Sequence, residues 1–113
     1  VFGILGGIGP HPEDVIHMKR TADRLLGPEN YHWSVLGAGR NQMRIAGMSA
    51  AMGGNVRVGL EDSLWAGAGK LAESNAAQVK TARQIIEGLG LEIASSDEAR
   101  DILSLKGGDK VAF

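Results

Sequence analysis

The sequence contains no cysteine, little net charge and no long hydrophobic run. The lack of cysteine excludes disulfides and thiolate metal sites, and it fits a reducing compartment. A net charge of −1 gives no indication of nucleic acid or an anionic membrane as a partner. No apolar run approaches the ~20 residues needed to cross a bilayer. The opening "VFGILGG" lacks the basic stretch of a signal peptide, so none is expected.

Glycine, in contrast, is abundant. It makes up 17 of the 113 residues, about twice the usual share of ~7%. The glycines follow apolar runs, as at positions 6–7, 37–39 and 53–54, and therefore mark the ends of structural elements. The sequence begins inside the apolar run 1–9, so we expect it to be part of a longer chain.

The sequence pattern predicts strands and helices in alternation. Apolar and β-branched runs predict strands over 1–9, 31–39 and 55–62, the first of them buried on both faces. Helical spacing and capping residues predict helices over 12–26, 41–52 and 74–88. A glycine-containing loop is expected over 63–72, and the capping box Ser95-x-x-Glu98 predicts a short last helix.

Three strand–helix units in succession predict a parallel α/β sheet. Three parallel strands alone would leave two unpaired edges and little for the helices to cover. We therefore expect the fold class α/β, as a (β/α)8 TIM barrel of which this chain supplies about the last three βα units. Residues 1–113 would form the C-terminal part of a single domain, and the N-terminal strands would come from elsewhere.

Two glycine-rich stretches can be compared with phosphate-binding motifs. "GAGKL" (67–71) does not match GxxxxGK[ST], because the glycine spacing is too short and Leu71 follows the lysine. "LGAGRNQ" (36–42) places GxG between a strand and a helix, which is half of a dinucleotide fingerprint. The amides of Gly37 and Gly39 would then form an anion site. The alternative is a tight turn with Arg40 in solvent.

The three histidines, His11, His17 and His32, do not form a metal motif. His11 and His17 are six residues apart, which does not place two ligands on one helical face. His32 lies near the start of its strand, away from the end where such folds carry chemistry. We expect all three to be surface or packing residues.

The run "NVRVGLED" (55–62) is the strongest candidate site. On a strand, Val56 and Val58 would face the helices while Arg57 and Glu61 would enter the barrel lumen. An unpaired charge there would cost several kcal/mol. An Arg57–Glu61 ion pair would avoid that cost, but four strand residues span roughly 13 Å, which argues against such a pair.

A metal ion is the other way to neutralise the carboxylate. Gly59 leaves room for Arg57 to extend toward Glu61 and Asp62 at the C-terminal end of the strand. Two carboxylates above an arginine resemble a metal ligand beside a general base. Their position also favours a catalytic role, because residues at this end of barrel strands carry the chemistry.

The sequence resembles a known family in "WSVLGAGRNQ", "AMGGNVRVGLEDSLW", "GKLAESNAAQV" and "SSDEARDIL". These stretches are similar to the C-terminal part of the β-keto acid cleavage enzymes, the group that contains 3-keto-5-aminohexanoate cleavage enzyme. The resemblance implies a zinc-dependent, cytoplasmic TIM-barrel enzyme that is a homo-oligomer, such as a tetramer. It implies a reaction in which a β-keto acid and acetyl-CoA give acetoacetate and a new acyl-CoA.

The resemblance also implies roles for individual residues. Glu61 matches the glutamate that binds zinc, Asp62 matches the acidic base, and Arg57 matches the arginine that works with it. The glycine turn, with Gly37, Gly39, Arg40 and Gln42, is a candidate contact for substrate or CoA. The two zinc-binding histidines of the family come from an early strand, so we expect this segment alone to be inactive.

Two alternatives stay open from the sequence. A different metal-dependent TIM-barrel lyase, of aldolase type, would share the Glu61 ligand without the CoA chemistry. A non-catalytic barrel fragment would use Arg57 and Asp62 only as an ion pair with a partner chain.

Overall fold

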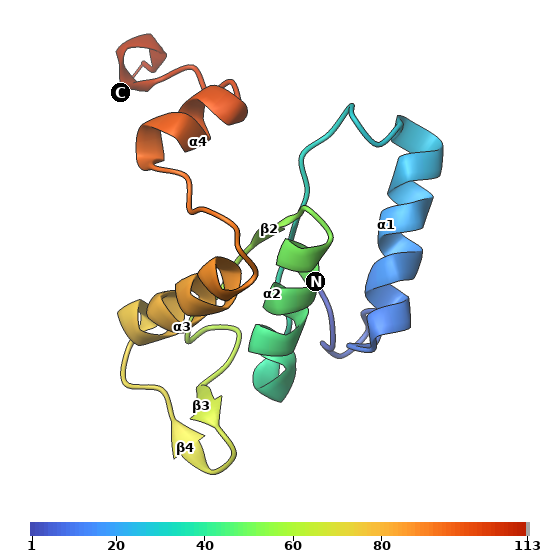
Figure 1. The fold of residues 1–113 in the computed structure, drawn as a ribbon, viewed down its shortest axis with the longest axis vertical. Helices are drawn as coiled ribbons and strands as arrows, with labels where there is room; N and C mark the ends of the chain where they lie inside the picture. Colours follow the sequence, from blue (N-terminus) through green and yellow to red (C-terminus); the bar gives the residue numbers. More distant parts are fainter. Residues whose placement is uncertain (113) are drawn as a thin grey trace.

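The computed structural model describes residues 1–112, and helices dominate this part of the chain (Figure 1). Helices α1, α2 and α3 stand side by side with α2 between the others, and α4 lies apart from them (Figure 1). None of the helices in the described residues is both long and apolar enough to cross a bilayer. The elements are α1 (Pro12–Leu26), β1 (Ser34–Val35), η1 (Gly39–Asn41), α2 (Gln42–Ala51), β2 (Asn55–Val56), β3 (Trp65–Gly67), β4 (Lys70–Leu71), α3 (Asn75–Gly88), α4 (Ser96–Ile102) and η2 (Gly108–Lys110).

The predicted helices are confirmed, and their ends follow local chemistry. Helix α1 ends at Gly27, whose φ of 81° is a conformation that glycine adopts readily. Ser74 caps α3 by accepting a hydrogen bond from the Ala77 amide at 3.1 Å. The predicted capping box is present before α4, where Ser95 and Glu98 bond each other's backbone amides.

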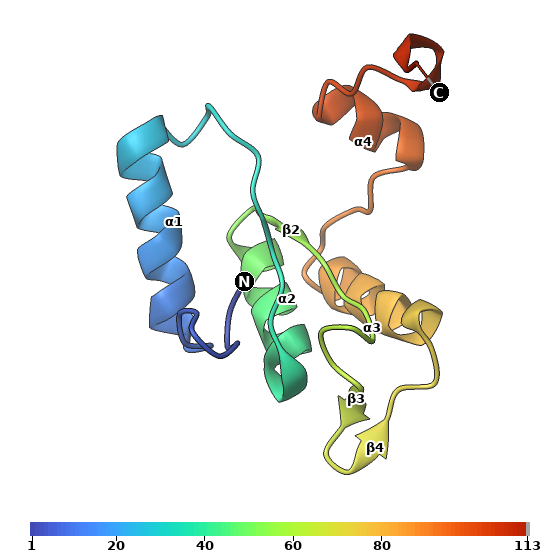
Figure 2. The same cartoon turned by 180° about the vertical axis from the view of Figure 1, so that it is seen from behind.

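The strands are shorter than predicted, but their arrangement is parallel as expected. β1 pairs with β2 in parallel, with Ser34 opposite Asn55 and Val35 opposite Val56. Phe2 makes a parallel bridge to Gly37, just beyond β1. Three extended segments therefore lie next to one another in chain order, and helices α1 and α2 connect them (Figure 2).

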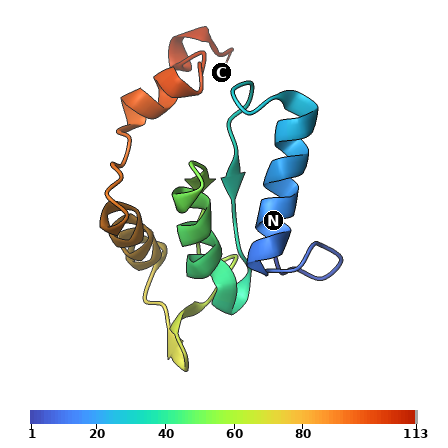
Figure 3. The same ribbon diagram turned by 45° about the vertical axis from the view of Figure 1, so that its right-hand side comes forward.

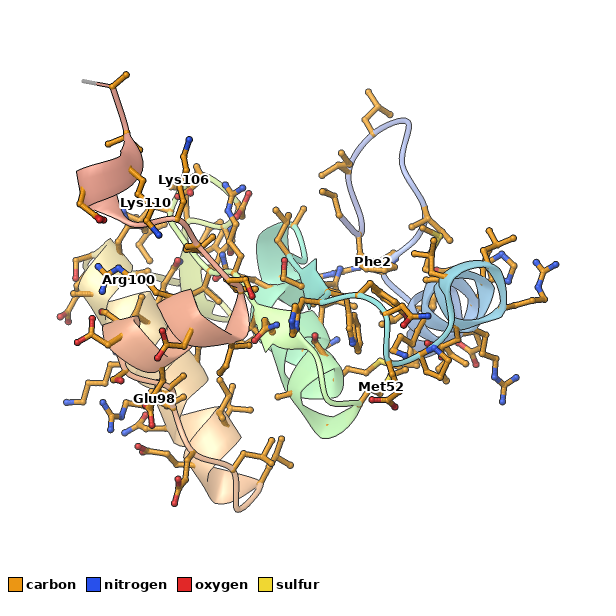
Figure 4. All side chains as sticks on the ribbon, turned by 90° about the horizontal axis from the view of Figure 1, so that it is seen from above. Phe2, Met52, Glu98, Arg100, Lys106 and Lys110 are labelled. Atoms are coloured by element: carbon orange, nitrogen blue, oxygen red, sulfur yellow. The ribbon has the colours of Figure 1, made fainter. Side chains whose placement is uncertain are left out.

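The prediction of a doubly buried strand over 1–9 is wrong. Phe2 is buried, but Ile4 and Leu5 are exposed, and the loop next to Phe2 projects away from the helices (Figure 4). Gly3 and Gly6 have φ values of 80° and 79°, which interrupt an extended chain. These glycines explain why an apolar run does not become a strand.

The predicted loop over 63–72 contains a hairpin. β3 and β4 pair antiparallel, with Trp65 opposite Leu71. Gly69 has a φ of 70° and lies in the tight turn between the two strands. The "GAGK" stretch is thus part of this hairpin.

The core lies where α2 packs against the parallel strands (Figure 3). Its centre is formed by Phe2, Val15, Val35 and Ile45. The prediction that α2 is substantially covered is confirmed, because its buried residues include Ile45, Ala46, Ser49 and Ala50. The apolar residues Met18 and Leu25 of α1, Val79 of α3 and Leu89 directly after α3 stay exposed.

A polar cluster fastens α1 to the chain entering β1. Lys19 forms an ion pair with Asp23, and Tyr31 donates a hydrogen bond to the same carboxylate at 2.8 Å. The Lys19 ammonium lies 5.3 Å from the Tyr31 ring centroid and 5.5 Å from that of Trp33. The Lys19 hydrogen bond, with that of Tyr31, lowers the pKa of Asp23.

We expect Gly54→Ala to destabilise the protein by about 1–3 kcal/mol, because it overpacks the interior. A Cβ at position 54 would lie 2.5 Å from Ser49 Oγ and 2.6 Å from Cζ2 of Trp33. Gly88→Ala is the control, since a Cβ there meets no atom within 4 Å. Chemical unfolding of the whole protein measures both; equal stability of the two variants would contradict the packing seen at Gly54.

Candidate functional site

The candidate site lies at the C-terminal ends of the parallel segments. Two loops meet there: η1, which follows β1, and the turn that follows β2. The Gly39 amide donates a hydrogen bond to the Asp62 carbonyl at 2.8 Å and joins the two loops. This end of a parallel sheet is where ligands and catalytic side chains usually lie.

The predicted strand 55–62 ends early and becomes a turn. The Arg57 amide still donates to the Val35 carbonyl at 2.9 Å, so the pairing continues to this residue. The Gly59 carbonyl then accepts hydrogen bonds from the amides of Asp62 at 3.2 Å and Ser63 at 3.1 Å. Glu61 and Asp62 therefore lie on a tight turn and not on the strand.

The turn brings both carboxylates to one guanidinium group. Arg57 Nη2 lies 3.0 Å from Glu61 Oε1, and Arg57 Nε lies 3.3 Å from Asp62 Oδ2. The argument that strand spacing disfavours an Arg57–Glu61 pair was wrong, because the chain reverses after Gly59. The predicted grouping of Arg57, Glu61 and Asp62 is present.

The two carboxylates differ in their environment. The Asp62 side chain is 12% exposed, whereas those of Glu61 and Arg57 are 56% and 53% exposed. Asp62 Oδ2 has no well-oriented hydrogen bond among the described residues, so its contact with Arg57 is mainly an ion pair. A shielded carboxylate is suited to proton transfer, and an open carboxylate is suited to binding a ligand from solvent.

Glu61 is held in its ionised form. A hydrogen bond from its own backbone amide, together with that from Arg57, lowers the pKa of its carboxyl group. Gly59 makes room for it, because a Cβ at position 59 would lie 2.7 Å from Glu61 Cδ and 2.9 Å from Oε1. Gly59 thus accommodates Glu61, and not Arg57 as the sequence suggested.

The glycine turn 37–42 mainly supports the site. Gly37 is buried, and a Cβ there would lie 2.7 Å from that of Ile45. The Gly39 amide is already used by Asp62, and Gln42 is buried with its amide nitrogen 2.8 Å from the Gly59 carbonyl oxygen. These contacts argue against direct substrate binding by the three residues, whereas Arg40 is exposed.

Two further residues near the site were missed from the sequence. Asn75 Oδ1 accepts a hydrogen bond from the Leu60 amide at 2.7 Å. Gln78 is buried, and its Nε2 donates to the Ser63 carbonyl at 2.6 Å. Gln78 lies four residues before the buried Ala82 on α3, so a polar residue on the covered stripe of a helix was the available indication.

The described residues do not form a complete metal site. Among residues 1–112, no group of three or more His, Cys, Asp or Glu side chains is placed to hold an ion. The three histidines, His11, His17 and His32, are exposed, as expected for surface residues. Glu61 and Asp62 would therefore need ligands from outside this chain segment.

Comparison with known proteins points to one family. The sequence model described as beta-keto acid cleavage enzyme matches residues 1–105. A 3,5-dioxohexanoate:acetyl-CoA acetone transferase from Paraburkholderia graminis is 63% identical over the whole chain, which covers 36% of that protein. A 3-keto-5-aminohexanoate cleavage enzyme from Fusobacterium nucleatum is 48% identical over 79 residues, or 70% of this chain and 29% of the relative.

A third relative is named as an acetyltransferase. The 3-oxoadipate:acetyl-CoA acetyltransferase from Cupriavidus necator is 38% identical over 105 residues, or 93% of this chain and 36% of the relative. The chain therefore spans about a third of the length of the relatives that it matches.

Proposed function

The chain belongs to the beta-keto acid cleavage enzyme family, and we propose that the whole protein cleaves a β-keto acid with acetyl-CoA to acetoacetate and a new acyl-CoA. The observation that carries the proposal is the convergence of Glu61 and Asp62 on Arg57 at the C-terminal end of β2. Two relatives have acetyl-CoA in their names, which supports acetyl-CoA as the second substrate.

We propose that the parallel segments are the last three strands of a (β/α)8 barrel. Phe2, β1 and β2 are neighbours in chain order, and helices connect them, as that fold requires. The exposed apolar residues of α1 and α3 support a larger assembly. The rest of the barrel, a homo-oligomer such as a tetramer and a cytoplasmic location stay predictions.

Glu61 is proposed as one protein ligand of Zn²⁺. Its carboxylate is ionised and half exposed, and Oε2 bonds no other side chain among the described residues, so it can serve as a ligand. The remaining ligands would be two histidines from the upstream part of the barrel. When bound, the ion would act as a Lewis acid that polarises the β-keto oxygen.

Asp62 is proposed as the general base that removes a proton α to a carbonyl group. Its carboxylate is shielded from solvent, and within residues 1–112 its Oδ2 accepts no well-oriented hydrogen bond and lies 3.3 Å from Arg57 Nε. Arg57 offsets part of the charge of the two carboxylates and orients both. Arg40 is proposed to contact the CoA substrate from the neighbouring loop.

The test is acetoacetate release by the whole protein. We expect release that requires both acetyl-CoA and a β-keto acid, with 3,5-dioxohexanoate as the first acid to assay because a relative at 63% identity is named for it. Cleavage that needs no acetyl-CoA would favour the aldolase-type lyase instead. No cleavage of any β-keto acid tried would contradict the proposal.

We expect Gly59→Ala to weaken zinc binding by about 10–100-fold, the usual effect of disturbing a residue that orients a ligand. The new Cβ would displace the Glu61 carboxylate from its place over position 59. Competition with a chelator measures the affinity. Gly67→Ala is the control, since a Cβ there meets nothing within 4 Å; equal affinities would contradict the proposed role of Gly59.

A further inference from the structure

We propose that three amide side chains, Gln42, Asn75 and Gln78, act as positioning residues that fix the turn carrying Glu61 and Asp62. This inference rests on the proposed function for its catalytic meaning. The three side chains come from two helices, α2 and α3. They form hydrogen bonds with the backbone at Gly59, Leu60 and Ser63. We call these contacts the amide clamp.

The two glutamines hold the ends of the turn. Gln42 Nε2 donates to the Gly59 carbonyl at 2.8 Å, and Gln78 Nε2 donates to the Ser63 carbonyl at 2.6 Å. Both side chains are 2% exposed, so their hydrogen bonds do not compete with bulk solvent. Their Oε1 atoms have no hydrogen-bond partner in the described residues, so the hydrogen bond to the turn is the polar contact that each of these amides makes there.

Asn75 holds the middle of the turn. Its Oδ1 accepts a hydrogen bond of 2.7 Å from the Leu60 amide, next to Glu61. The Gly39 amide adds a fourth bond, to the Asp62 carbonyl at 2.8 Å. The backbone is thus held at 59, 60, 62 and 63, on both sides of the carboxylates.

The clamp explains how a short turn keeps two carboxylates on one arginine. Glu61 and Asp62 are consecutive, and their side chains reach Arg57 only while the chain reverses after Gly59. Small shifts of a catalytic group lower the rate sharply, because the reacting atoms lose alignment. The amides therefore act through the turn, without touching the substrate.

Asn75 offers the cleanest test, because it is exposed and Ser74 remains as the cap of α3. In the whole protein, Asn75→Ala removes the acceptor, whereas Asn75→Asp keeps an oxygen for the Leu60 amide. We expect Asn75→Ala to speed hydrogen exchange of the peptide spanning 58–64 about five-fold, the effect of losing one hydrogen bond. We expect kcat to fall roughly ten-fold with little change in KM.

Asn75→Asp is expected to restore slow exchange and most of kcat. The control is Thr81→Ala, which removes a side-chain hydrogen bond of 3.1 Å to the Ala77 carbonyl on the same helix but away from the turn. It is expected to change neither readout. Unchanged exchange in Asn75→Ala, or faster exchange without a loss of kcat, would overturn the proposal.

The two proposals can fail separately. A wild-type protein without β-keto acid cleavage would contradict the proposed function alone. The exchange comparison of the alanine and aspartate variants requires no turnover, so it still decides whether the clamp holds the turn.

Discussion

Asp62→Asn is expected to lower kcat of the whole protein by about 10²–10⁴-fold, because the amide cannot accept the substrate proton. Asparagine has nearly the same shape, and the Asp62 main chain would keep its hydrogen bond from the Gly39 amide. The substrate would therefore still bind, and KM should change little. Steady-state kinetics of acetoacetate release measure both constants.

The matched control for this change is Asp97→Asn. Asp97 also pairs with an arginine, Arg100, at 2.7 Å, but it is exposed on α4, and Arg100 lies on the opposite side of the molecule from Phe2 (Figure 4). We expect this control to keep the wild-type kcat. A fall of less than ten-fold in Asp62→Asn would contradict the assignment of Asp62 as the base.

Glu61→Gln is expected to weaken zinc binding by at least about 100-fold, since even residues that only orient a ligand contribute 10–100-fold. A neutral amide is a poor ligand for Zn²⁺, and the pKa of Glu61 is lowered, so the wild-type side chain is charged. Elemental analysis of the purified whole protein measures the bound zinc.

The control for Glu61→Gln is Glu87→Gln. Glu87 forms the same type of pair, four residues after Arg83 and at 2.7 Å, with similar exposure. It therefore separates loss of a surface ion pair from loss of a ligand. Zinc retained in Glu61→Gln would contradict the ligand role, and a folding defect without any metal would favour the non-catalytic fragment.

The helices could be predicted from the sequence because their ends are fixed locally. Gly27 ends α1, Ser74 caps α3 and Ser95 caps α4. Each of these residues bonds a residue only three or four positions away in the chain. The parallel order of the extended segments also followed from the alternation of elements. The length of the first strand could not be predicted in this way, because Gly3 and Gly6 change the chain direction inside an apolar run.

The site was predicted in composition but not in geometry. The residue types and the position after a strand singled out Arg57, Glu61 and Asp62. Their contacts depend on a turn at Gly59, and the alternation of hydrophobic residues extended the predicted strand across it. The roles of Asn75 and Gln78 depend on contacts fifteen residues away in the chain, which no local pattern reveals.

The most direct test is crystallography of the whole protein at the zinc absorption edge. The account predicts one anomalous peak per chain, about 2.0–2.2 Å from a carboxylate oxygen of Glu61. Asp62 should lie next to this peak and keep its ion pair with Arg57. A peak bound elsewhere, with Glu61 paired only to Arg57, would contradict it.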